Sequence, residues 1–356
     1  MTPEDDGDNS TERPAPITLA VDAMGGNNAP GEVVAAVAEA STERRSGRPV
    51  FFILVGDETR LTDELLEHGH NPERIRIRHA PEVVDPGESA QQALTEKTGC
   101  SIDVACRLVA EGRADGVVTA GHPGAAVLSG KRHLKRVPGT EHAALCSVYP
   151  TPRERGPKGD RFSLLLDVGA SHSATADDLH SFALMGSAYS RVVSGLEHPR
   201  VSLLSTAAES GAGPPEVRRA AKMIGKDDRL NFFGCCEGHD IPNGRADVVV
   251  CNGYVGNVTI KILEGVSEAA FDLARAAYDE KLLWRMGLRM LSGGLDQLKR
   301  MTDFEEYGGA PVLGLEGVMI VAHARSGRKA VANALRLAIK NVKSELPDRI
   351  HQLLTD

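Results

Sequence analysis

Glycine and asparagine residues stand directly after an apolar, β-branched run near the start of the chain. Gly25, Gly26 and Asn27 follow the strand expected over residues 17–21. Glycine accepts positive φ where a chain leaves a strand, and Pro30 suits the first turn of a helix expected through about residue 43. Backbone amides and a helix N-terminus would then meet at one phosphate or carboxylate. The alternative is a tight turn that binds nothing, and the absence of GxGxxG argues against a dinucleotide.

The same arrangement recurs four times further along the chain. Each time an apolar run ends in residues that could bind an anion or move a proton: Gly121, His122 and Gly124 in 115–126; Asp167 in 162–173; Asn252, Gly253, Gly256, Asn257 and Lys261 in 247–261; and His323 in 318–327. Ligands of open α/β sheets bind beyond the carboxyl ends of the strands. We therefore expect all five segments to contribute to one cleft.

Strand and helix patterns alternate between residues 15 and 346. They predict a single α/β domain of two lobes with a doubly wound, mostly parallel sheet. Strands are expected at 17–21, 50–55, 74–79, 143–148, 200–205 and 231–233, and helices at 176–193 and 329–346, among others. Residues 1–14 carry five acidic side chains and predict a disordered acidic tail. Residues 347–356 are expected to form a C-terminal tail.

Composition excludes several classes of protein. The 356 residues include 41 basic and 49 acidic side chains, and the resulting net charge of −8 disfavours a nucleic-acid partner. The six cysteines form no CxxC pair and predict reduced, buried thiols, although Cys235 and Cys236 leave redox or metal chemistry as an alternative. We expect no metal and no cofactor. The lack of a long apolar run or a signal sequence predicts a cytoplasmic protein, with the inner membrane surface as an alternative location.

A helical hairpin is expected over 273–303. Lys281, Arg285 and Arg289 lie four residues apart on one stripe, and apolar residues that include Trp284 cover most of the remaining surface. Such a helix needs a covering partner. One interpretation is burial in a homodimer. The other is that 281–301 contacts anionic lipid or an acidic carrier protein, and both can hold together.

Six motifs resemble one known family. They are VDAMGGNNAP, EGRADGVVTAGHPGA, LLLDVGA, FALMGSAYS, ADVVVCNGYVGNVTIKILEG and YGGAPVLGLEGVMIVAH. In this order, over about 17–346, they are similar to the bacterial phosphate acyltransferases, which convert acyl-acyl-carrier-protein and inorganic phosphate into acyl phosphate for phospholipid synthesis. The resemblance implies a homodimer with a fold related to phosphate acetyltransferases and isopropylmalate-type dehydrogenases. It also implies acyl carrier protein and phosphate as partners, and a hairpin at the dimer edge that faces the membrane.

The chain departs from the family pattern at the polar tips of these motifs. Asn27 and Asn252 stand where the family has aspartates, His122 and Pro123 replace an Asn-Thr pair, and Ala324 replaces a glycine. These changes leave an alternative function: a catalytically silent or repurposed paralogue that binds an acyl carrier or a membrane.

The reaction implied by the resemblance needs no covalent nucleophile. Phosphate must be positioned, the tetrahedral oxyanion needs donors, and the departing thiolate needs stabilisation. Lys261 and the amides near Gly25 and Gly253 are expected to hold phosphate, with His323 as acid or donor and Asn252 beside them. The alternatives are a solvated Lys261 and a purely structural His323.

Overall fold

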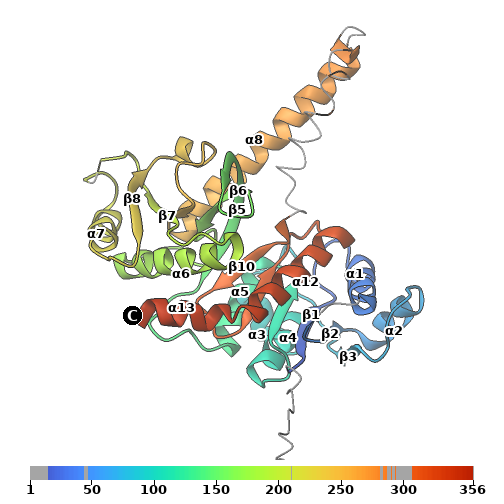
Figure 1. Ribbon diagram of the computed structural model, residues 1–356. Helices are drawn as coiled ribbons and strands as arrows, with labels where there is room; N and C mark the ends of the chain where they lie inside the picture. The colour runs from blue at the N-terminus through green and yellow to red at the C-terminus, as the bar shows by residue number, and fades with distance from the viewer. Residues whose placement is uncertain are drawn as a thin grey trace, which may run out of the picture.

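The computed structural model describes residues 15–43, 47–209, 211–280, 284–286, 290, 293 and 307–355. Two lobes lie side by side, and the long helix α8 (Gly253–Glu280) projects away from both (Figure 1). The acidic tail predicted for 1–14 and most of the hairpin beyond residue 280 lie outside the described residues.

One sheet of eleven strands runs through both lobes. Five parallel strands form its first part, in the spatial order β3 (Ile75–His79), β2 (Val50–Gly56), β1 (Ile17–Asp22), β4 (Gly116–Thr119) and β11 (Val318–Val321). Four parallel strands form its last part, in the order β6 (Asp160–Leu166), β9 (Val248–Val250), β7 (Arg200–Leu204) and β8 (Asn231–Cys236). The predicted mostly parallel α/β sheet is thereby confirmed.

The two strands between these parts set the direction of the last four strands relative to the first five. β10 (Ala310–Leu313) is antiparallel to β11 and to β5 (Ala144–Arg155), and β5 is antiparallel to β6. Three reversals lie between β11 and β6, so the last four strands run opposite to the first five. Their carboxyl ends therefore point in the opposite direction.

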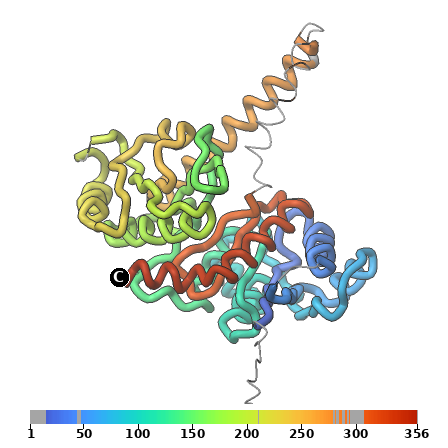
Figure 2. The backbone as a smooth tube through the Cα atoms, in the orientation of Figure 1, coloured from blue at the N-terminus to red at the C-terminus, as the bar shows by residue number. Residues whose placement is uncertain are grey.

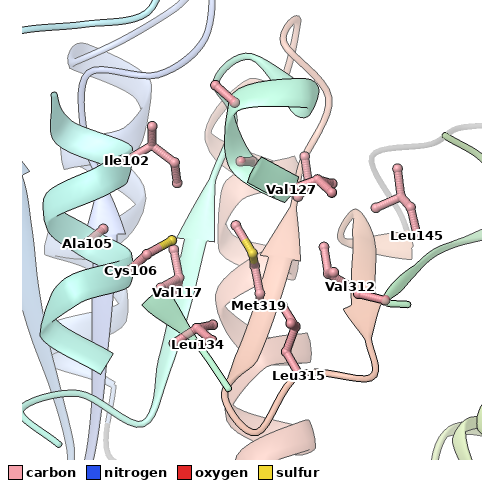
Figure 3. Packing of buried hydrophobic residues seen from close by; sticks show 14 of the residues in the cluster. Ile102, Ala105, Cys106, Val117, Val127, Leu134, Leu145, Val312, Leu315 and Met319 are labelled. Carbon is pink, nitrogen blue, oxygen red and sulfur yellow. The ribbon is translucent and has the colours of Figure 1, made fainter. Parts of the chain in front are cut away.

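Helices cover both faces of the sheet, as Figure 2 shows for the chain path. Their bounds are α1 (Gly31–Thr42), α2 (Glu58–Leu66), α3 (Ala90–Glu96), α4 (Ser101–Ala110), α5 (Pro123–His133), α6 (Ala176–Ser194), α7 (Pro215–Ile224), α12 (Arg328–Lys343) and α13 (Leu346–Thr355). In the first lobe, α4 and α5 pack aliphatic residues such as Ile102 and Val127 against Val117 and Met319 of the sheet (Figure 3).

The C-terminal residues form a packed helix, so the prediction of a tail over 347–356 is wrong. α12 ends at Lys343, and Glu345 has a φ of 51°, a left-handed conformation that breaks the helix. Pro347 then lies in the first turn of α13, the helical position that tolerates a residue without an N–H group. Leu346 and Ile350 are buried in the core of the second lobe.

All six cysteines are free and buried, which confirms the prediction for them. Cys235 and Cys236 lie at the end of β8 as separate thiols. Burial raises the pKa of Cys236 to about 12, which keeps it protonated and unreactive near neutral pH.

Candidate functional site

Asp22 is the buried polar centre of the first group of candidate residues. It ends β1 beside Thr119, the last residue of β4, and is 2 % exposed. Its carboxylate accepts hydrogen bonds from Thr119 Oγ1 at 2.7 Å and from the Met24 amide at 3.3 Å. Burial raises the pKa of Asp22, while these donors oppose the rise. Asp22 was not among the predicted site residues, although an acidic residue at the end of a buried strand was a usable signal.

The glycines around Asp22 allow two turns to touch. A Cβ on Gly25 would lie 2.5 Å from Asp22 Oδ2 and 2.7 Å from the backbone of Gly121. Gly26 has a φ of +104°, which favours glycine.

Three amides of these turns are bonded within the protein. The Gly25 amide interacts with Asp22, the Gly121 amide donates to Thr119 Oγ1 at 2.9 Å, and the Asn27 amide donates to the Ala324 carbonyl at 2.8 Å. An anion held at these turns would therefore also need side-chain cations.

Three cationic or protonatable side chains that could bind an anion lie near these turns. His323 and Arg325 follow β11, next to the Asn27 turn, and the charge of Lys261 from α8 reaches His323. Arg325 Nη2 lies 2.9 Å from Glu268 Oε1, which joins this loop to α8. Lys261 thus lies near enough to His323 for its charge to act on the ring.

The hydrogen bonding of His323 defines its chemical role. Its Nδ1 accepts the Arg325 amide at 3.2 Å, so the neutral imidazole carries its proton on Nε2 and is a donor there. Burial, and then the positive charges of Arg325 and Lys261, lower the pKa of His323 from 6.5. The ring is consequently neutral near pH 7.

His122 caps the start of α5, the helix that follows β4. Its Nδ1 accepts the Ala125 amide at 3.3 Å as the N-cap of α5, and Pro123 follows as the first helical residue. A Cβ on Gly124 would lie 3.1 Å from the His122 ring. The His-Pro departure from the family pattern therefore forms a normal helix start.

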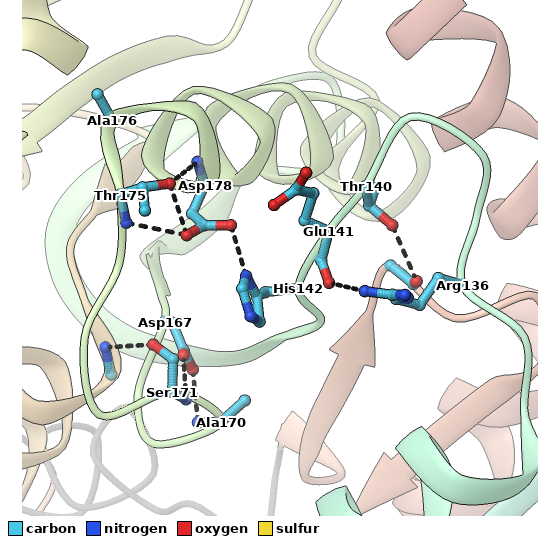
Figure 4. A network of polar contacts seen from close by, with 12 residues as sticks. Arg136, Thr140, Glu141, His142, Asp167, Ala170, Ser171, Thr175, Ala176 and Asp178 are labelled. Atoms are coloured by element: carbon cyan, nitrogen blue, oxygen red, sulfur yellow. Dashed lines mark hydrogen bonds and ion pairs between the residues drawn. The ribbon is translucent and has the colours of Figure 1, made fainter.

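Asp167 organises a second group of residues at the end of β6. It is fully buried and accepts four backbone amides, from Leu145 at 2.9 Å, Gly169 at 3.0 Å, and Ala170 and Ser171 at 2.8 Å each. Figure 4 shows the carboxylate directed at this loop. Asp167 thus fixes the conformation of the loop that follows β6.

The start of α8 packs tightly on this loop. A Cβ on Gly253 would lie 2.2 Å from the Ser171 carbonyl oxygen, and one on Gly256 only 1.9 Å from the Asp167 carbonyl oxygen. Asn252 Oδ1 accepts the Val255 amide at 2.9 Å and so caps α8. Asn257 lies 3.8 Å from the Cβ position of Gly169.

The candidate residues thus follow two sets of strands that run in opposite directions, β1, β4 and β11 in one set and β6 and β9 in the other. One buried cluster contains residues from both sides, among them Val127, Val168 and Ile260. α8 spans the two sets: Lys261 is eight residues, about 12 Å, beyond Gly253. A second link is Lys131, which the sequence analysis missed; at the end of α5, its Nζ donates to the Ala170 carbonyl at 2.8 Å.

Solved structures with this fold include acyl-group transferases. A phosphotransacetylase from Streptococcus pyogenes superposes with a TM-score of 0.61 at 17% identity, covering 92% of this chain and 94% of that one. A branched-chain phosphotransacylase from Enterococcus faecalis gives a TM-score of 0.52 at 17% identity, with 92% and 99% covered. At 17% sequence identity, the structural similarity shows a shared fold and nothing more.

Sequence comparison then gives the family. The model of the family described as "Fatty acid synthesis protein" matches residues 17–349, and the chain belongs to this family of phosphate acyltransferases. A phosphate acyltransferase from Trichlorobacter lovleyi is 39% identical over 96% of this chain and 95% of its own length. Another, from Desulfitobacterium hafniense, is 40% identical over 93% and 98%. The protein is accordingly a transferase enzyme of lipid biosynthesis.

Within the described residues, no helix combines the length and the apolar composition needed to cross a bilayer.

Proposed function

We propose that the protein transfers a fatty acyl group from acyl-acyl-carrier-protein to inorganic phosphate, which yields acyl phosphate for phospholipid synthesis. Membership of the phosphate acyltransferase family supports the reaction class. The observation that carries the proposal is the grouping of Lys261, His323 and Arg325 beside the strand ends of β1, β4 and β11.

In the proposed mechanism, phosphate is the nucleophile and the protein positions and stabilises charge. Lys261 and Arg325 hold the phosphate dianion, whose oxygen attacks the thioester carbonyl carbon and forms a tetrahedral oxyanion. The carbon–sulfur bond breaks as the carbonyl group re-forms. The electron pair leaves with the carrier thiolate. The Nε2–H group of His323 donates to the carbonyl oxygen as it becomes an oxyanion, the charge that enzymes stabilise most effectively.

Other candidate residues support this site indirectly in the proposal. Asp22, Gly25 and Gly121 fix the turns under it, and Asn27 anchors the loop that carries His323. Asn252 and Asp167 hold the start of α8 and thereby the position of Lys261. No step requires a metal or a nucleotide.

The first prediction is direct formation of acyl phosphate. With a long-chain acyl-acyl-carrier-protein and phosphate, in the presence of EDTA and without nucleotide, mass spectrometry should detect acyl phosphate well above a heat-inactivated control. Hydrolysis of the product must be corrected for. If several acyl lengths give only the control level, the transferase proposal fails and the silent, carrier- or membrane-binding paralogue takes its place.

The second prediction concerns α8, which we propose as the homodimer interface. Ile262, Val266 and Leu273 are 58%, 63% and 72% exposed, at spacings that place them on one stripe of the helix. Ile262→Glu combined with Val266→Glu should convert dimers to monomers, since burying each apolar side chain contributes about 1.5 to 3 kcal/mol. Light scattering measures the mass, with Asp272→Lys as a control on another face of α8.

Liposome flotation of the same variants tests the other proposed role of this region, peripheral contact with the inner membrane surface by a cytoplasmic enzyme. Loss of flotation with an unchanged mass assigns the stripe to lipid binding. An unchanged mass and unchanged flotation would contradict both roles.

A further inference from the structure

A basic groove lies where α12 passes the end of α6, away from the site described above. It has a volume of about 420 Å³ and is lined by Val192, Arg336, Ile339, Lys340, Lys343 and Ser344. The three cationic residues are spaced four and three residues apart and so share one face of α12. Val192 and Ile339 add apolar surface beside them. Such a groove suits a small anion that carries an alkyl group.

Two lysines meet at one edge of this groove. Lys340 Nζ donates to the Val193 carbonyl at 2.9 Å, and Lys158 Nζ donates to the same oxygen. Two amines that share one acceptor lie close together, and the positive charge of each disfavours a positive charge on the other.

Lys340 is the amine that loses its proton. Lys158 is exposed to solvent, whereas Lys340 is half-buried. Burial and the neighbouring Lys158 lower the pKa of Lys340 to about 8, and Asp160, on the strand that follows Lys158, opposes the shift only in part. Arg336 and Lys343 line the same groove from α12, and Arg336 Nη2 lies 3.7 Å from Glu43 Oε1. A neutral amine is a nucleophile, while an ammonium group is not.

We propose that Lys340 is an acyl acceptor, which takes the acyl group from an acyl phosphate bound in this groove. The amine lone pair attacks the carbonyl carbon, the bond from that carbon to the phosphate oxygen breaks, and phosphate leaves with the electron pair. The nitrogen loses a proton to solvent and an amide remains. The proposal rests on the proposed function only for the origin of the acyl phosphate, because the acylation step itself needs none of the catalytic residues.

The experiment supplies acetyl phosphate to the purified full-length protein and follows each lysine by peptide mass spectrometry. Lys222, exposed on α7, is the internal reference. At pH 7.5 a lysine with a pKa near 8 has a neutral fraction about two-hundredfold above that of an ordinary lysine. Since a weaker base is also a weaker nucleophile, we expect Lys340 to react about tenfold faster than Lys222. Its rate should be half-maximal near pH 8.

Two further measurements distinguish a specific binding site at Lys340 from general lysine reactivity. Lys158→Met should slow acetylation of Lys340 by about threefold or more at pH 7.5, as the pKa of Lys340 rises, and leave the rate at pH 10 unchanged. Lys222→Met is the matched control and should have no effect on Lys340. Added inorganic phosphate should protect Lys340 and not Lys222, because it competes for the groove.

Equal rates at Lys340 and Lys222 would overturn the proposal, as would a Lys340 rate that is insensitive to Lys158→Met. Fast labelling that phosphate does not slow would also overturn it, because the groove would then bind no acyl phosphate. Since the acyl donor is added from outside, these outcomes are independent of whether the protein makes acyl phosphate itself. A failed transferase assay and a failed labelling assay are therefore distinguishable.

Discussion

Lys261→Met should lower kcat/KM for phosphate by about a hundredfold, the loss typical of removing one preorganised charge donor from a transition state. Methionine keeps the length and flexibility of the side chain, and Lys261 is exposed on α8, so the fold should be unaffected. The remaining cation, Arg325, already pairs with Glu268 and only partly compensates. Steady-state kinetics with varied phosphate measures the effect, and Lys222→Met, on α7, is the control.

The pH profile adds a second readout to this variant. The positive charge of Lys261 is one cause of the lowered pKa of His323, so its removal lets that pKa rise towards 6.5. As the pH falls, His323 of the variant therefore becomes protonated at a higher pH than His323 of the unaltered protein. The acid limb of the kcat/KM profile should then move to higher pH. A profile and a kcat/KM equal to those of the unaltered protein would show that Lys261 is a solvated helix residue.

The sequence predicted several strands and helices well because they carry strong local signals. Residues 17–21 and 50–55 are continuous apolar runs bounded by glycine or polar residues, and both form buried parallel strands. Local signals also mark both ends of α6. Thr175 caps its start, and Gly195, with a φ of 71°, ends it. These outcomes depend on neighbours in the sequence.

The arrangement of the candidate site depends on contacts that no local pattern contains. β10 was not predicted, and without it nothing indicates that β6 and β9 run opposite to β1. The close contact of Gly25 with Gly121 joins two segments that are far apart in the sequence. The local glycine pattern predicts an anion cradle but does not reveal this contact.

The largest structural effect should come from Gly256→Ala at the start of α8. The new Cβ would lie 1.9 Å from the Asp167 carbonyl oxygen and 2.8 Å from Cys251 Sγ, so α8 must move away from β6. Overpacking of this kind costs about 1 to 3 kcal/mol of unfolding free energy, or more. Urea unfolding measures that loss. Because Lys261 moves with the helix, turnover should also fall, by about a hundredfold for a displacement near 1 Å.

Gly265→Ala is the matched control, since it makes the same substitution two to three turns further along α8. A Cβ there meets nothing within 4 Å, and alanine in a helix interior is favoured over glycine by about 0.8 to 1.0 kcal/mol. The control should therefore leave turnover unchanged and keep or raise the stability. If Gly256→Ala behaved like Gly265→Ala in both measurements, the contact between α8 and Asp167 would not position Lys261, and the second group of residues would have no part in the activity of the first. If stability fell while turnover per folded molecule stayed constant, the contact would serve the fold alone.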